Sequence, residues 1–157
     1  MSTHPEVGSP APDFELMGSH GKTVSLKHFR GQPVVLYFYP KDDTPGCTVE
    51  ACEFGQEHPK FGKLDAVVLG VSPDSLESHL KFIKKFDLPF QLLVDHDHHV
   101  ASRYGLWVEK QMFGKTFMGV QRATFLIDRE GRIAEAWPKV KAEGHAAEVL
   151  KALRAVG

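Results

Sequence analysis

Two cysteines, Cys47 and Cys52, are the residues of this chain whose type and position are best suited to chemistry. Cys47 comes two residues after Pro45, in what the sequence predicts to be the first turn of a helix. Backbone N–H groups without partners and the positive end of the helix dipole favour an anion at that place. A thiol there is biased toward the thiolate, the reactive form of cysteine. The pattern therefore predicts a site built around a nucleophilic sulfur.

A predicted strand and a predicted helix must position this sulfur. The strand is the apolar, β-branched and aromatic run Val34–Tyr39, and the helix is expected to continue to about Phe61. Thr44 stands where an N-cap residue belongs, directly before Pro45 at the first helical position. The loop between strand and helix thus delivers Cys47 just past the carboxyl end of a central strand.

The five-residue spacing of the two cysteines limits how they can react with each other. On an intact helix it sets the two Cα atoms roughly 8.5–9 Å apart on different faces. A disulfide requires Cα atoms closer than about 7 Å, so the first turns must unwind before the sulfurs can join. A permanent disulfide is disfavoured because it would destroy the predicted helix, and a thioredoxin-type dithiol would use Cys-x-x-Cys spacing. The third interpretation is a reaction cycle with two shapes, since terminal turns beside Pro45 and Gly46 open at low free-energy cost.

Composition limits the other classes of function. The chain has 157 residues, 42% hydrophobic and 25% charged, with a formal net charge of −1, as in one ordinary globular domain. We expect no nucleic-acid partner and no membrane attachment, since there is no basic stripe and no apolar run of bilayer length. Residues Met1–Glu6 do not resemble a secretory signal, so a cytoplasmic location is expected. No metal is expected at the cysteines, because no further ligand at zinc-site spacing accompanies them.

The rest of the chain alternates between predicted strands and helices. Strands are predicted at Lys22–Leu26, Ala66–Val71, Gln91–Val94, Thr124–Asp128 and Ile133–Trp137, the last two flanking a hairpin turn. Helices are predicted at Ser75–Phe86, with Leu76, Leu80, Ile83 and Phe86 on one face, near Val100–Tyr104, and at Glu143–Val156, with Ala147, Leu150 and Leu153 facing inward. This order indicates an α/β fold with a central mixed β-sheet covered by helices.

Several motifs together resemble those of the peroxiredoxins. Pro40, Thr44 and Cys47 match the active-site signature Pro-x-x-x-Thr-x-x-Cys, and the stretch Tyr37–Cys52 is similar to the peroxiredoxin Q branch. The resemblance also takes in Ala11–Phe14, Tyr104–Trp107 and Arg122–Asp128, and it covers nearly the whole chain. It implies a thioredoxin-like fold with an amino-terminal extension, formed as a single domain by residues 1–157.

The resemblance implies a thiol-dependent peroxidase that needs no metal, haem or flavin cofactor. Cys47 would attack the O–O bond of hydrogen peroxide or an organic hydroperoxide and become a sulfenic acid. Cys52 would then condense with it to an intramolecular disulfide, which thioredoxin or a similar dithiol protein would reduce. Because such a disulfide needs no partner subunit, a monomer is favoured.

The same resemblance assigns roles to three further residues. Arg122 would hold the thiolate and the peroxide oxygens through its fixed guanidinium donors. Thr44 would act both as an N-cap and as a hydroxyl that bonds the peroxide. Pro40 would shield the sulfur from water and excess oxidant. The plainer interpretations are a surface arginine, a helix cap alone and a strand terminator.

Two other classes of function compete with the peroxidase. A thioredoxin-like disulfide oxidoreductase or thiol-based chaperone is poorly supported, because the chain has no Cys-x-x-Cys and Ala123-Thr124 stands where a cis-proline segment would lie. A non-catalytic scaffold leaves the Thr44–Cys47 arrangement unexplained.

Two other groups of residues have a structural interpretation first. His96–His99 is interpreted as a solvated turn and helix cap, with metal binding as the alternative. An aromatic and methionine cluster is interpreted as core or a loop anchor, with a wall of the peroxide pocket or packing on the unwinding helix as alternatives; it comprises Trp107, Met112, Phe113, Phe117 and Met118.

Overall fold

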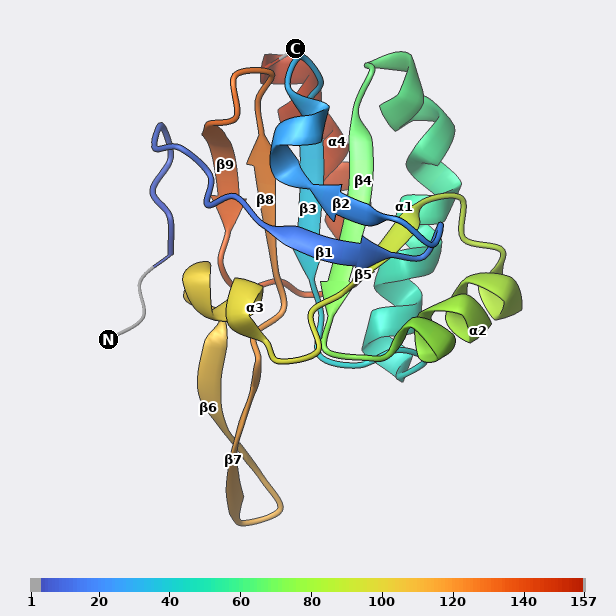
Figure 1. Ribbon diagram of the computed structural model, residues 1–157, viewed down its shortest axis with the longest axis vertical. Helices are drawn as coiled ribbons and strands as arrows, with labels where there is room; N and C mark the ends of the chain where they lie inside the picture. The colour runs from blue at the N-terminus through green and yellow to red at the C-terminus, as the bar shows by residue number, and fades with distance from the viewer. Residues whose placement is uncertain (1–3, 157) are drawn as a thin grey trace.

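A mixed seven-stranded β-sheet forms the centre of the molecule, for which a computed structural model describes residues 4–156 (Figure 1). Across the sheet the strands are ordered β2-β1-β5-β4-β3-β8-β9. The parallel centre consists of β3 (Val34–Phe38), β4 (Val67–Ser72) and β5 (Gln91–Val94), with β8 (Ala123–Ile127) and β9 (Ile133–Trp137) antiparallel on one side. The predicted α/β fold with a mixed sheet is confirmed. Residues 1–3 and 157 lie outside the described residues. The predicted domain includes all four of them, and the segment compared with a secretory signal includes residues 1–3.

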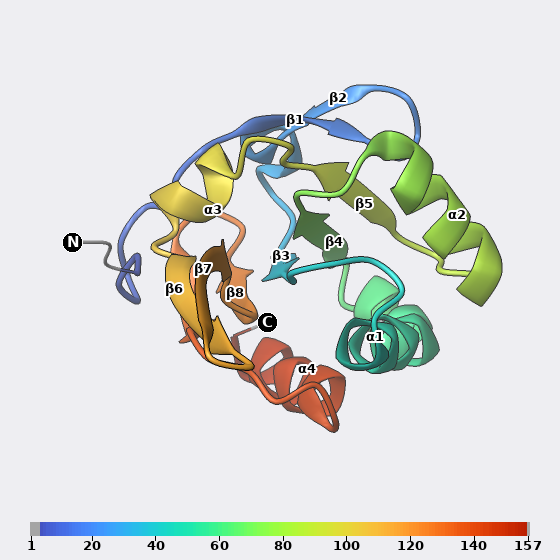
Figure 2. The same ribbon diagram turned by 90° about the horizontal axis from the view of Figure 1, so that it is seen from below.

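Helices cover both faces of this sheet, as Figure 2 shows. The long helices α1 (Pro45–Lys63), α2 (Leu76–Phe86) and α4 (His145–Val156) pack buried side chains such as Phe54, Phe82 and Val149 against one face. The other face is covered by the amino-terminal segment, the 3-10 helix η1 (Leu26–Phe29) and the short helix α3 (His99–Arg103). No helix within residues 4–156 combines the length and hydrophobicity needed to cross a bilayer.

Three strands were not predicted. β1 (Glu15–Gly18) pairs with both β2 (Thr23–Ser25) and β5, and extends the sheet at one edge. β6 (Trp107–Met112) and β7 (Lys115–Val120) form a separate antiparallel hairpin that projects from the body of the protein (Figure 1).

The hairpin overturns most of the interpretation of its aromatic and methionine residues as core. Phe113 at its tip is 96% exposed, and Met112, Phe117 and Met118 are also exposed. Only Trp107 is an anchor: its indole stacks on the imidazole of His98 with ring centroids 3.6 Å apart. The tip and most of β7 face solvent, so apolar residues there carry no signal of packing.

One residue was placed incorrectly on each of two predicted helix faces, whereas Leu150 and Leu153 of α4 are buried as predicted. In α2, Leu80 is exposed, while the neighbouring His79 is fully buried. In α4, Ala147 is exposed and Ala146 is buried instead. The cause in α2 is chemical, because the buried position holds a polar side chain whose ring nitrogens both have hydrogen-bond partners.

The sheet brings two distant segments to the start of α1. β8 runs antiparallel to β3, with Ala123 opposite Phe38. The residue before β8, Arg122, therefore lies beside the loop that leaves β3. Seventy-five residues of sequence separate Arg122 from Cys47, yet they meet at this edge of the sheet.

Candidate active site

Cys47 lies in the first turn of α1, where its side chain is buried. The helix begins at Pro45 after an extended N-cap residue, Thr44, whose carbonyl accepts the Thr48 N–H at 2.8 Å. Cys52 is half-buried on the same uninterrupted helix, and both thiols are free. In this state the two sulfurs cannot join, because helix geometry keeps their Cα atoms about 8.5–9 Å apart.

Arg122 contacts the sulfur directly. Its Nη2 donates to Cys47 Sγ at 3.2 Å, and its Nη1 donates to Glu50 Oε1 at 2.7 Å. The guanidinium fork is thus held by two acceptors at once, which fixes its orientation. Burial lowers the pKa of Arg122, but the Glu50 carboxylate and the Cys47 sulfur raise it more, so the residue keeps its positive charge.

Glu50 is a site residue that the sequence analysis missed. Its carboxyl group is buried, and its Oε2 atom has no hydrogen-bond partner among the described residues. Burial raises the pKa of Glu50 from 4.5 to about 7, and the favourable charge of Arg122 only partly offsets this. The sequence feature that could have identified Glu50 is its position three residues after Cys47, which puts both side chains on one helix face.

This raised pKa predicts a pH dependence of stability that Glu50→Gln should lose. Between pH 4.5 and about 7 the folded protein holds a proton that the unfolded chain has released. The stabilising contribution is complete below the unfolded-state pKa and disappears as pH rises through the folded-state value, a loss of about 3 kcal/mol. Relative to wild type, Glu50→Gln should therefore gain roughly 2–3 kcal/mol in free energy of unfolding between about pH 5 and about pH 8. Urea unfolding at both pH values measures this difference.

A second glutamate on the same helix provides the control. Glu57 forms a surface pair with Lys60 at 3.1 Å, so Glu57→Gln should follow the wild-type pH dependence closely. Identical pH dependence in Glu50→Gln and wild type would contradict the raised pKa.

Gly46 leaves room for the guanidinium next to the sulfur. A Cβ atom on Gly46 would lie 3.1 Å from Arg122 Nη2, which is tighter than an ordinary van der Waals contact. The absence of a side chain at this position therefore allows Arg122 to approach both Cys47 and Glu50.

Two more residues near the sulfur were not expected. Tyr37 stacks on Phe54 with ring centroids 4.8 Å apart, and its buried hydroxyl has no partner within the described part of the chain. Burial raises the pKa of Tyr37 strongly, with Glu50 and Cys47 adding to the effect. Burial lowers the pKa of Lys110 in β6, Arg122 lowers it further, and Cys47 opposes the effect. The sulfur therefore belongs to the apolar cluster that contains Tyr37 and Phe54, and Arg122 places positive charge against it.

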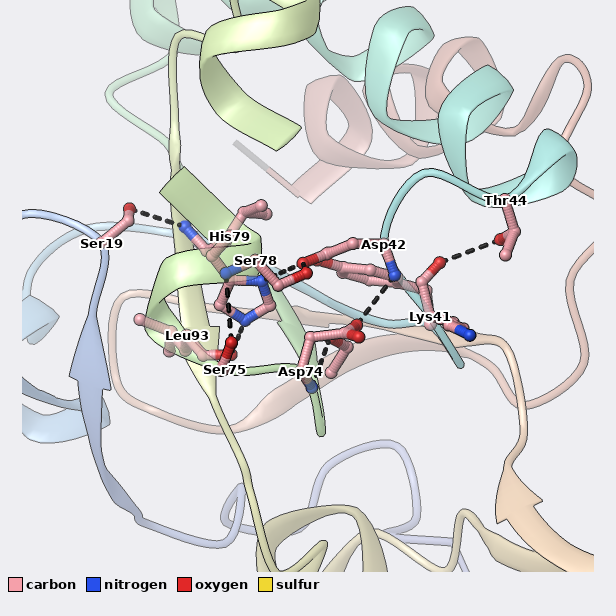
Figure 3. Close-up of polar contacts among 12 residues, drawn as sticks. Ser19, Lys41, Asp42, Thr44, Asp74, Ser75, Ser78, His79 and Leu93 are labelled. Carbon is pink, nitrogen blue, oxygen red and sulfur yellow. Dashed lines mark hydrogen bonds and ion pairs between the residues drawn. The ribbon is translucent and has the colours of Figure 1, made fainter. Parts of the chain in front are cut away.

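Thr44 and Pro40 lie in the loop between β3 and α1. Thr44 occupies the N-cap position, but its hydroxyl makes no capping hydrogen bond. It donates instead to the Lys41 carbonyl at 2.9 Å (Figure 3). Pro40 is half-buried, two residues after the end of β3. The structure thus brings Arg122 into direct contact with both Cys47 and Glu50, whereas Thr44 and Pro40, in the loop before α1, form no hydrogen bond with the sulfur within residues 4–156.

The His96–His99 loop lies away from this cluster and leads into α3. Asp95, just before it, accepts hydrogen bonds from the Val100 and Ala101 N–H groups at 3.2 and 2.9 Å. The capping group is therefore Asp95 rather than a histidine. His99 Nδ1 lies 2.5 Å from Asp97 Oδ1, with which it forms a hydrogen bond, and 3.4 Å from Asp95 Oδ1.

Comparisons with known proteins agree on one family. The AhpC/TSA family matches residues 7–136. Peroxiredoxin Bcp of Bacillus subtilis (strain 168) is 55% identical over 149 residues, covering 95% of each chain. The crystal structure of a cysteine-to-serine mutant of Xylella fastidiosa PrxQ has a TM-score of 0.92 at 40% identity, covering 98% of each chain. A structure of Xanthomonas campestris bacterioferritin comigratory protein, described for its alkyl peroxide reduction activity, has a TM-score of 0.89 at 41% identity, covering 96% of this chain and 99% of that one.

These matches extend over nearly the full length of the chain and include the strand, loop and helix that carry Cys47. The resemblance to peroxiredoxins and the thioredoxin-like fold are therefore confirmed, and the reaction is the reduction of peroxides by a thiol. The two cysteines of α1 are consistent with an intramolecular disulfide. The chain belongs to the AhpC/TSA family, within its peroxiredoxin Bcp/PrxQ branch.

Proposed function

We propose that Cys47 is the peroxidatic nucleophile of this thiol peroxidase and Cys52 its resolving partner. The observation that carries the proposal is the 3.2 Å contact between Arg122 Nη2 and Cys47 Sγ at the start of α1. A fixed cation and the helix dipole both stabilise negative charge on this sulfur. No comparable cation contacts Cys52 within the described residues, where burial raises the pKa of the thiol.

In the first step the Cys47 thiolate attacks one oxygen of the peroxide. The O–O bond breaks, the sulfur becomes a sulfenic acid, and the other oxygen leaves as water or an alcohol after taking a proton. Arg122 donates hydrogen bonds to the peroxide oxygens as negative charge moves onto the leaving oxygen. Thr44 is proposed to turn its hydroxyl from the Lys41 carbonyl to the peroxide, and Pro40 to limit access of water. Hydrogen peroxide and organic hydroperoxides are the proposed substrates.

In the second step the Cys52 thiol condenses with the sulfenic acid, forming the disulfide and releasing water. The first turns of α1 must unwind for this, since the intact helix keeps the sulfurs apart. Phe54 limits how far unwinding can extend, because its ring is fully buried between Tyr37 and Phe61. Unwinding also releases Cys52 from the partial burial that raises its pKa, which makes it a better nucleophile.

The remaining features of the cycle are proposed from the same geometry. Thioredoxin or a similar dithiol protein reduces the disulfide once unwinding exposes it. Because both cysteines belong to one helix, no second subunit is needed, which supports a monomer. The two free thiols and the formal net charge of −1 support a cytoplasmic location. Residues 1–157 are proposed to form one domain, because both hydrophobic cores share a single sheet.

Cys52→Ser tests the resolving role. Sub-stoichiometric hydrogen peroxide should convert an equivalent amount of the reduced wild-type protein to a Cys47–Cys52 disulfide, as measured by mass spectrometry and thiol loss. The variant should consume one equivalent at the wild-type rate but retain a sulfenic acid that excess peroxide oxidises further. Its turnover with thioredoxin should fall by on the order of 10- to 100-fold, because an intramolecular step becomes bimolecular.

A small thiol provides the control for this experiment, since it can reach the sulfenic acid without Cys52. Turnover of Cys52→Ser should therefore recover with the small thiol. If Cys52→Ser turned over with thioredoxin as fast as the wild-type protein, Cys52 would not be the resolving residue.

A further inference from the structure

A buried polar cluster joins the loop before α1 to helix α2, and the peroxidase chemistry does not use it (Figure 3). His79 of α2 is fully buried, with its Nδ1 2.7 Å from Asp42 Oδ2 and its Nε2 2.8 Å from the Leu93 carbonyl. Asp42 also accepts from Tyr39 Oη at 2.5 Å and from Ser78 Oγ at 2.8 Å. The Tyr39 and Ser78 hydroxyls therefore both donate to this carboxyl group.

The hydrogen bonds determine where the protons lie. A carbonyl oxygen can only accept, so the Nε2 atom of His79 must carry a proton. The Nδ1 atom faces a carboxylate oxygen that already accepts from Ser78, so a second proton lies between His79 and Asp42. Donation from the Tyr39 and Ser78 hydroxyls favours the ionised carboxylate, which leaves the second proton on the imidazole. The arrangement is thus an imidazolium paired with a carboxylate inside the protein.

This pair holds the loop at a single residue. The backbone N–H of Asp42 also donates to Asp74 Oδ2 at 2.8 Å, and Asp74 is fixed in turn by Ser72 Oγ at 2.6 Å. The next residue, Asp43, is exposed and only forms a surface ion pair with Lys85 at 2.7 Å. Tight attachment to the body of the protein therefore ends at Asp42, just before Thr44 and the catalytic helix.

We propose that Asp42 and His79 are positioning residues that anchor the amino-terminal end of the segment of α1 that unwinds in the catalytic cycle. The inference rests on the proposed function, in which unwinding lets Cys52 reach Cys47. The unwinding segment is then bounded on one side by Asp42 and on the other by the buried ring of Phe54. The anchor favours the folded helix start, in which Arg122 contacts the sulfur.

Weakening the anchor should affect the two chemical steps differently. Reaction with peroxide needs the folded helix start, so its rate falls with the fraction of molecules that are folded there. Disulfide formation needs the unwound start, so its rate stays the same or rises. A residue that only stabilised the whole fold would change the midpoint of unfolding without separating the two steps.

The test measures both rate constants in Asp42→Asn and His79→Gln by rapid mixing with hydrogen peroxide. Because the folded start remains the major population after a tenfold weakening, each variant should speed disulfide formation by up to about tenfold, at the lower end of the effect of a charged hydrogen bond, and should slow the peroxide step by less than about twofold. Asp43→Asn is the matched control, because it changes the adjacent exposed carboxylate, and both of its rate constants should stay within about twofold of wild type. Ring ¹⁵N chemical shifts should identify His79 as an imidazolium, assigned by their loss in His79→Gln.

Several outcomes would overturn the inference. Equal slowing of both steps, or no change in either, would show that the pair does not control the unwinding. A neutral His79 ring would overturn the charged pair. If Asp42→Asn does not fold, Ser78→Ala removes one donor from the same carboxylate and should shift the two rates in the same directions, by less. The proposed function fails separately, if wild-type protein forms no Cys47–Cys52 disulfide.

Discussion

Replacing Cys47 by serine is expected to abolish peroxide turnover, with the rate constant lowered by on the order of 10⁴-fold or more. The substitution changes one atom at a buried position, so the fold and the Arg122 side chain should remain in place. Activity is lost because a serine hydroxyl does not ionise near neutral pH, whereas the reaction needs an anionic nucleophile. Peroxide consumption by the reduced protein measures the loss.

The remaining cysteine cannot take over in this variant. Burial raises the pKa of the Cys52 thiol, so Cys47→Ser should lose its single thiol to peroxide more slowly than free cysteine does. Cys52→Ser is the matched control, since it also leaves a single thiol but should keep the wild-type first step. Peroxide consumption by Cys47→Ser at the wild-type rate would assign the nucleophile to another residue.

Local sequence signals predicted the elements that deliver the nucleophile. The apolar run at β3 and the Thr44-Pro45 start of α1 act over a few residues, and both elements were predicted to within about two residues of their observed ends. The strand β1, next to the edge strand β2, and the hairpin of β6 and β7 were missed because they lack a buried run of their own. Strand pairing there depends on neighbours distant in sequence.

The contacts between elements could be predicted only in part. Arg122 was assigned through the family resemblance, because no local pattern connects it with Cys47 across 75 residues. Glu50 was missed because glutamate is usually exposed, and its burial depends on Arg122. The pair of Asp42 and His79 is separated by 37 residues and was hidden by the expectation that apolar side chains such as Leu80 occupy the inner face of α2.

Arg122→Met is expected to lower the rate constant for peroxide by about 10²- to 10³-fold, the usual cost of removing a donor that stabilises developing negative charge. Methionine keeps much of the length and apolar stem of arginine but neither donates to the sulfur nor carries charge. Stopped-flow mixing of the reduced variant with hydrogen peroxide measures the effect. Arg129→Met, at the other end of β8, removes a partly exposed arginine paired with Asp65 and should change the rate by less than about twofold.

Arg122→Met should also destabilise the protein, since Glu50 loses the only hydrogen-bond partner that its carboxyl group has in the described structure. The pKa of Glu50 should rise further above 7, because the charge that lowers it is gone. The loss of stability should be larger near pH 8 than near pH 5, reaching about 3 kcal/mol where the carboxylate would be charged and unpaired. Adding Glu50→Gln should recover most of this stability but none of the rate. Recovery of the rate together with stability would mean that Arg122 acts only by neutralising Glu50 and not on the sulfur.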